Sequence, residues 1–134
     1  MKSSILTFVF ATFLLLFISN FGNAQTKKTS ITSAKATIEI IQFHSEHRCM
    51  TCNKIEELTR ETLKSYPTIL FSLVNVDDKK NEKIATQFEA SGTALFLYNP
   101  TNKKKQDLTE MAFMNAGDKD KFIQELKKKI DAFK

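Results

Sequence analysis

The sequence predicts one α/β domain whose elements follow the order β-α-β-α-β-β-α. Short runs rich in β-branched and aromatic residues alternate with segments in which apolar residues recur every three or four positions, a pattern typical of alternating strands and helices. The only two cysteines of the 134-residue chain, Cys49 and Cys52, lie where the first strand-like run gives way to the first helical pattern. A Cys-x-x-Cys pair is therefore expected at a strand-to-helix junction.

Four runs are predicted as strands. Residues 37–43 and 68–76 are nearly continuous apolar runs, which are typical of strands buried on both faces. Residues 93–98 form a third strand. Residues 106–113 form a weaker fourth strand, because their alternation of apolar and polar residues is poor.

Three helical patterns complete the domain. The first covers residues 49–65 and stops at Pro67, since the residue before a proline avoids the helical region. The second is capped by the Asp77-Asp78 pair and is expected to end near Gly92, and Asp118 is the predicted N-cap of the last helix. Four phenylalanines fall on the inward positions of their elements and are predicted core residues: Phe71, Phe88, Phe96 and Phe122.

The first residues have the pattern of an export signal. Lys2 precedes a mostly apolar stretch at residues 5–18, and Gly22-Asn23-Ala24 is a small-x-small cleavage site. The stretch is shorter than the roughly 20 residues that cross a bilayer, although retention as an anchor stays open. We expect a periplasmic or secreted product, in a compartment where thiols can cycle through disulfides. The expected organisation is a signal peptide, a flexible leader and one domain: residues 1–24, 25–36 and 37–134.

The distribution of charge and the absence of several motifs argue against some classes of function. The formal net charge is +5, but the basic residues are dispersed and form no stripe interleaved with aromatic residues, so nucleic-acid binding is not favoured. No Ser/His/Asp grouping, phosphate-binding loop or close pair of carboxylates in an apolar setting is present. Hydrolase and nucleotide-dependent functions therefore have no support.

A Cys-x-x-Cys pair at this junction, in this order of elements, resembles the thioredoxin-like superfamily over residues 37–134. The resemblance implies a mixed four-stranded sheet flanked by helices on both faces. The first two strands would be parallel, and the last two would form an antiparallel hairpin beside the first. It also implies a thiol-disulfide oxidoreductase that uses Cys49 and Cys52 as its redox-active pair.

The two cysteines are expected to have different roles. Cys49, at the start of a helix with Arg48 beside it, should have a lowered pKa and act as the nucleophile. Cys52, one turn further, would be shielded and would resolve the mixed disulfide. His47 is expected to stabilise the thiolate or to carry a proton near neutral pH. A purely structural disulfide is a second interpretation, although so short a ring contributes only about 2 kcal/mol.

Metal binding is the alternative function. His44 and His47 lie just before the cysteines, and two imidazoles with two thiolates can hold Zn²⁺ or Cu(I). This alternative predicts a periplasmic metal-binding module whose ligands are His44, His47, Cys49 and Cys52. Thiol exchange, in contrast, needs no metal and no cofactor.

Three positions depart from the pattern of the superfamily. The dipeptide Met50-Thr51 between the cysteines indicates neither the reducing nor the oxidising branch. Gln42 stands where thioredoxins carry a buried acidic proton relay, and Thr93 stands at the cis-proline position, which makes it a substrate-facing residue. The expected partners are disulfide-containing or thiol proteins and an extracytosolic redox partner. Neither nucleic acid nor stable membrane insertion after signal cleavage is expected.

Overall fold

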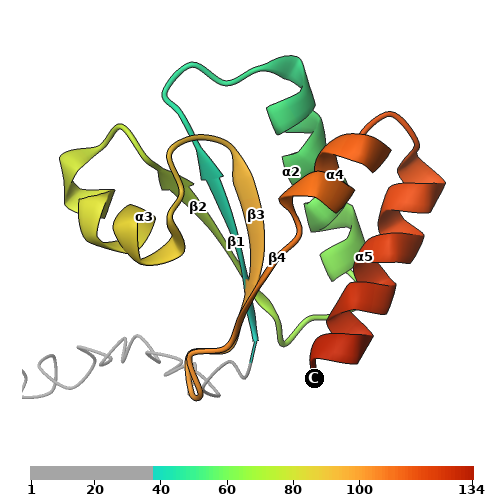
Figure 1. Ribbon diagram of the computed structural model, residues 1–134. Helices are drawn as coiled ribbons and strands as arrows, with labels where there is room; N and C mark the ends of the chain where they lie inside the picture. The colour runs from blue at the N-terminus through green and yellow to red at the C-terminus, as the bar shows by residue number, and fades with distance from the viewer. Residues whose placement is uncertain (1–37) are drawn as a thin grey trace, which may run out of the picture. The chain divides into compact units, whose positions relative to one another are not determined.

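A computed structural model of the protein describes residues 38–134 (Figure 1), so the predicted signal peptide and leader lie outside the described residues. The elements are β1 (Glu39–His44), α2 (Met50–Leu63), β2 (Leu70–Asn75), the 3₁₀ turn η2 (Lys79–Asn81), α3 (Glu82–Phe88), β3 (Ala94–Tyr98), β4 (Lys105–Asp107), α4 (Thr109–Asn115) and α5 (Lys119–Phe133). None of the helices between residues 38 and 134 is long and apolar enough to cross a bilayer.

The four strands form one mixed sheet in the order β2-β1-β3-β4. β1 runs parallel to β2, with Ile41 opposite Ser72, and antiparallel to β3, with Ile41 opposite Phe96. β3 and β4 form an antiparallel hairpin. The mixed four-stranded sheet of the prediction is therefore confirmed, including the parallel β1–β2 pair and the antiparallel β3–β4 hairpin.

Helices cover both faces of the sheet, as Figure 1 shows: α3 lies on one side, and α2, α4 and α5 lie on the other. Because successive side chains of a strand point to opposite faces, β1 contributes Ile40 to one core and Phe43 to the other. The core under α2, α4 and α5 includes the fully buried Phe122. The core under α3 is aromatic, with ring centroids of Phe88 and Phe96 5.1 Å apart.

The predicted second strand is shorter than expected and is not buried on both faces. β2 pairs only with β1 and forms an edge of the described sheet, so just Val74 is buried along it. Leu70 is 54% exposed and Leu73 is 36% exposed. Phe71, predicted as core, is half-buried and packs against the edge of the core, whereas the other three predicted phenylalanines are buried. An apolar run alone does not separate an edge strand from a central one.

The prediction of a strand over residues 106–113 is wrong for most of that range. β4 ends at Asp107, and α4 begins at Thr109. Two hydrogen bonds fix the reversal: Asp107 Oδ1 accepts one from the Thr109 backbone N–H at 2.7 Å, and Thr109 Oγ1 accepts one from the Leu95 N–H at 3.1 Å. Leu108 and Ala112 are buried at helical spacing, a signal that the weak alternation concealed.

The predicted helix ends are confirmed in part. Asp118 caps α5 by accepting from the Lys121 N–H, as expected. Asp78 caps the 3₁₀ turn η2 rather than α3 itself. Gly92 does not end α3, because the helix stops at Phe88 and Glu89 takes the left-handed conformation at φ 56°.

Candidate active site

Cys49 and Cys52 form a disulfide at the start of α2, with their Cα atoms 5.2 Å apart. Cys49 is exposed, whereas Cys52 is only 5% exposed. The disulfide therefore joins an exposed residue to a buried one. This difference in exposure is the one that the predicted roles of nucleophile and resolving cysteine require.

Cys49 is the N-cap of α2 rather than a residue of its first turn. Its backbone is extended (φ −76°, ψ 162°), and its Sγ accepts a hydrogen bond from the Cys52 N–H at 3.2 Å. The sulfur thus occupies the place of the oxygen in an ordinary Ser or Thr cap. The first turn of α2 contains no acidic residue. A thiolate at this position would accept the Cys52 N–H and meet the positive end of the helix dipole, both of which favour an anion.

Thr93 lies in direct contact with the buried cysteine. Its Oγ1 is 3.1 Å from Cys52 Sγ, a hydrogen-bonding distance when sulfur is involved, and the hydroxyl is the donor because a disulfide sulfur carries no hydrogen. Thr93 immediately precedes β3, so strand pairing fixes its position relative to α2. The expected role of Thr93 in facing substrate stays a prediction, and its contact with the disulfide is an additional finding.

Gln42 lies beneath the cysteine pair and is completely buried. Its Nε2 donates a hydrogen bond to the Cys52 carbonyl oxygen at 2.9 Å, which ties β1 to the first turn of α2. Its Oε1 is buried and has no hydrogen-bond partner among the described residues. The amide thus holds the backbone of Cys52 but has no acidic proton to exchange there.

Arg48 points toward Glu56 on α2. Its Nη1 lies 2.6 Å from Glu56 Oε2, and Arg60 Nε lies 2.8 Å from Oε1 of the same carboxylate. Burial raises the pKa of Glu56, but the hydrogen bonds from Arg60 and Arg48 outweigh burial and hold the pKa below its ordinary value. The guanidinium charge of Arg48 is thus largely directed at Glu56, and support of the Cys49 thiolate by Arg48 stays a prediction. Sequence spacing indicates the Glu56–Arg60 pair but not the Arg48 contact, which depends on the loop conformation.

The two histidines do not join the cysteines. His47 is exposed, and His44 is half-buried with Nδ1 2.9 Å from the Ser45 carbonyl oxygen. Within residues 38–134 no three His, Cys, Asp or Glu side chains are grouped so that they could hold a metal ion. The structure therefore does not assemble the ligand set of the metal-binding alternative, and the expected support of the thiolate by His47 also stays a prediction.

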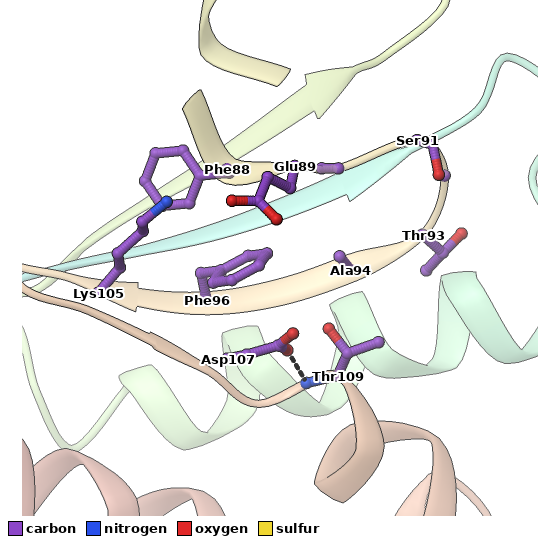
Figure 2. A pocket seen from close by; sticks show the side chains of 11 residues that line it. Phe88, Glu89, Ser91, Thr93, Ala94, Phe96, Lys105, Asp107 and Thr109 are labelled. Carbon is purple, nitrogen blue, oxygen red and sulfur yellow. Dashed lines mark hydrogen bonds between the residues drawn. The ribbon is translucent and has the colours of Figure 1, made fainter. Parts of the chain in front are cut away.

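A groove of about 550 Å³ lies beside the site, and Thr93 is one of its lining residues (Figure 2). It extends past Phe96 on β3 to the short strand β4. Sequence reasoning missed this groove. It lies at the end of β4, and no periodicity in the sequence indicated that β4 stops at Asp107.

No protein-family model matches the chain, and no curated protein matches it in sequence. Among solved structures, thioredoxin O2 from Arabidopsis thaliana in its oxidized state is 17% identical, with a TM-score of 0.44, over 53% of this chain and 60% of that one. Fasciola hepatica thioredoxin is 22% identical, with a TM-score of 0.44, over 57% and 70% of the two chains. Chlamydomonas reinhardtii thioredoxin f2 is 21% identical, with a TM-score of 0.46, over 64% and 83%. The chain thus spans less than two thirds of the length of the Arabidopsis protein.

The fold can be assigned from the sheet and the position of the cysteines. A central strand pairs in parallel with β2 and antiparallel with β3, helices lie on both faces, and the Cys-x-x-Cys pair opens the helix that follows that strand. Residues 38–134 therefore have a thioredoxin-like fold, with the Cys49–Cys52 disulfide at the start of the helix that follows the central strand.

Proposed function

We propose that the protein is an exported thiol-disulfide oxidoreductase in which Cys49 attacks the substrate and Cys52 resolves the intermediate. The observation that carries the proposal is the asymmetry of the disulfide: Cys49 is an exposed helix N-cap, and Cys52 is buried and contacts Thr93. Attack by an outside thiol or on an outside disulfide can reach only the first sulfur. The buried Cys52 sulfur can react only with Cys49.

In the reducing direction the Cys49 thiolate attacks one sulfur of a substrate disulfide. The bond between Cys49 and the substrate forms, the substrate S–S bond breaks, and the leaving thiolate takes a proton from solvent. Cys52 then loses its proton and attacks Cys49 Sγ, which forms the Cys49–Cys52 bond and releases the second substrate thiolate. The substrate gains two electrons and two protons, and the protein loses them. A dithiol donor outside the cytosol would return them by the reverse exchange.

Export is the second part of the proposal. It is supported by Lys2, the apolar stretch at residues 5–18 and the Gly22-Asn23-Ala24 motif. The expected partners are thiol or disulfide proteins of an oxidising compartment, where a redox pair of this kind can be used. Expression of the full chain followed by N-terminal sequencing tests the idea. A mature product that begins at Gln25 is expected, and an intact N-terminus on a cytosolic product would contradict export.

Trapping of mixed disulfides tests the chemical roles. A Cys52→Ser variant can form the bond between Cys49 and a substrate but cannot resolve it, so it should accumulate covalent complexes that reducing agents release. The matched Cys49→Ser variant leaves only the buried sulfur and should trap little. Equal trapping by the two variants would remove the assignment of roles, and no trapping by either would count against thiol exchange itself.

A further inference from the structure

The groove beside the disulfide lies where β4 ends. β4 pairs with residues Phe96 to Tyr98 of β3 and then ends, so Ala94 at the start of β3 has no neighbour from β4. The groove left there has a volume of about 550 Å³, which lies in the range of ligand-binding sites. Thr93 lines this groove, and its Oγ1 is 3.1 Å from Cys52 Sγ. The groove therefore begins one side chain away from the redox pair.

Two carboxylates flank the floor of the groove. In Figure 2, Glu89 at the end of α3 and Asp107 at the end of β4 lie on either side of β3, with Phe96 between them. Neither carboxylate belongs to an ion pair in the described part of the chain. Asp107 uses one oxygen to accept the Thr109 N–H, which leaves the other oxygen for a ligand.

The one cation in the groove is held by α3. Lys105 Nζ donates a hydrogen bond to the Gln87 carbonyl oxygen and lies 5.3 Å from the centroid of the Phe88 ring. In Figure 2 its ammonium group lies against that ring and away from Asp107. The two carboxylates thus outnumber the single cation here, whereas the chain as a whole has a net charge of +5.

We propose that this groove binds a Lys or Arg side chain that lies beside the reactive cysteine of a substrate peptide. The inference rests on the proposed thiol exchange and names the substrate class: peptide disulfides with a positive charge within a few residues of the sulfur that Cys49 attacks. Unpaired carboxylates attract such a charge, and a guanidinium matches a carboxylate with two parallel hydrogen bonds. The cation only positions the peptide, and the bonds formed and broken are those of the exchange described above.

Three synthetic peptide disulfides test the inference. They share one sequence and differ only in the residue beside cysteine, which is Lys, Gln or Glu. The full chain, reduced and freed of reductant, is mixed with each peptide at low salt, and the rate constant of protein oxidation is measured in a single turnover. The Lys peptide should react fastest and the Glu peptide slowest. Glu89→Gln and Asp107→Asn should each lower the Lys-to-Glu ratio by about twofold to fivefold, the range for exposed ion pairs, because both carboxylates are exposed.

A matched control variant and a change of salt concentration separate the effect of the two groove carboxylates from that of the overall charge of the protein. Asn at position 107 keeps the oxygen that accepts from Thr109, so the start of α4 should survive the change. Glu125→Gln makes the same change of charge on α5, on the other face of the sheet, and should leave the ratio unchanged. The ratio should also fall toward one as salt screens the charges.

Equal rates for the three peptides would overturn the inference and leave thiol exchange standing. A preference for Lys that survives both Glu89→Gln and Asp107→Asn would also overturn it, because the charge would then be sensed elsewhere. Failure of every peptide to oxidise the protein would instead reject the proposed function, and the inference with it.

Discussion

Cys52 Sγ and Thr93 Oγ1 lie 3.1 Å apart, and this contact joins the buried cysteine to the residue that precedes β3. A hydroxyl can accept a hydrogen bond from a thiol and can donate one to a thiolate. Thr93 can therefore follow Cys52 through both protonation states without moving. In the proposed exchange, Thr93 can thus stabilise the charge that Cys52 must carry before it attacks Cys49.

Thr93→Val should slow the resolving step. Valine keeps the shape of threonine but cannot donate to the Cys52 thiolate. A hydrogen bond to a charged group contributes about 1.5 kcal/mol, so resolution should be roughly tenfold slower. The lifetime of the mixed disulfide, measured by acid quench and mass spectrometry, reports this step. Thr93→Ser restores the hydroxyl and should react nearly as fast as the unchanged protein, whereas equal slowing in both variants would show that packing, and not the hydroxyl, matters.

Cys49 should be the fast thiol of the reduced protein. Its sulfur caps α2 and accepts the Cys52 N–H, so the thiolate is favoured and the apparent pKa should lie below the ordinary value of about 8.5. The rate of alkylation by iodoacetamide against pH, with the site read by mass spectrometry, gives this value. Cys52, 5% exposed, should react much more slowly at every pH. Two thiols of equal, ordinary reactivity would contradict the predicted activation.

The same alkylation tests the metal-binding alternative. His47 is exposed, and the described residues contain no grouped set of metal ligands. Any effect of one equivalent of Zn²⁺ or Cu(I) on alkylation of the thiols should therefore not depend on the histidines. A His44→Ala, His47→Ala double variant should therefore match the unchanged protein in its response to metal. Protection of both thiols that disappears in this variant would instead support the metal site of His44, His47, Cys49 and Cys52.

Local patterns predicted most of the fold because each element carries its own signal. The apolar run of β1, the helical spacing of α2 and the cap at Asp118 depend on neighbouring residues alone. The edge position of β2 depends on which strand pairs with which, and an apolar run does not record that. The turn from Asp107 into α4 depends on a hydrogen bond from Leu95 N–H to Thr109 Oγ1, across 14 positions of sequence.

As with the fold, the sequence predicted the position of the site but only part of its contacts. Spacing located Cys49, Cys52 and the junction that holds them, and the resemblance placed Gln42 and Thr93 near them. Spacing could not predict where a side chain points. Arg48 was expected to face the thiolate but reaches Glu56, eight positions further along the chain, because the loop before α2 turns it there. The groove also escaped prediction, because it is formed by the ends of three separate elements.

Gln42→Glu should make stability depend on pH. A carboxyl group at this buried position must stay protonated to donate to the Cys52 carbonyl oxygen, so burial would raise its folded pKa above the unfolded value of about 4.3. Below the pKa of the unfolded state the stability of this variant is constant. Between the unfolded pKa and the raised folded pKa, its free energy of unfolding falls by about 1.4 kcal/mol per pH unit as pH rises. Urea unfolding of the oxidised protein between pH 4 and pH 8 measures the loss. Gln42→Leu, which lacks a titrating group, should show a constant difference from the unchanged protein.

Glu56→Gln should destabilise the protein at neutral pH, and the effect should vanish in acid. Glu56 accepts from Arg48 and Arg60, and Arg48 already has buried Nε and Nη2 atoms without hydrogen-bond partners among the described residues. Loss of the carboxylate should therefore lower the free energy of unfolding by about 1 kcal/mol at pH 7. The pKa of Glu56 is depressed in the folded state, so its contribution is present above the unfolded pKa of about 4.3 and is lost as pH falls through the folded value. Urea unfolding of both proteins from pH 7 down to pH 3 should show free energies of unfolding that converge.

Glu57→Gln is the control, because Glu57 is an exposed carboxylate that pairs with Lys54. This change should lower the free energy of unfolding little at any pH. If the difference between Glu56→Gln and the unchanged protein instead stays constant in acid, packing rather than charge makes Glu56 stabilising.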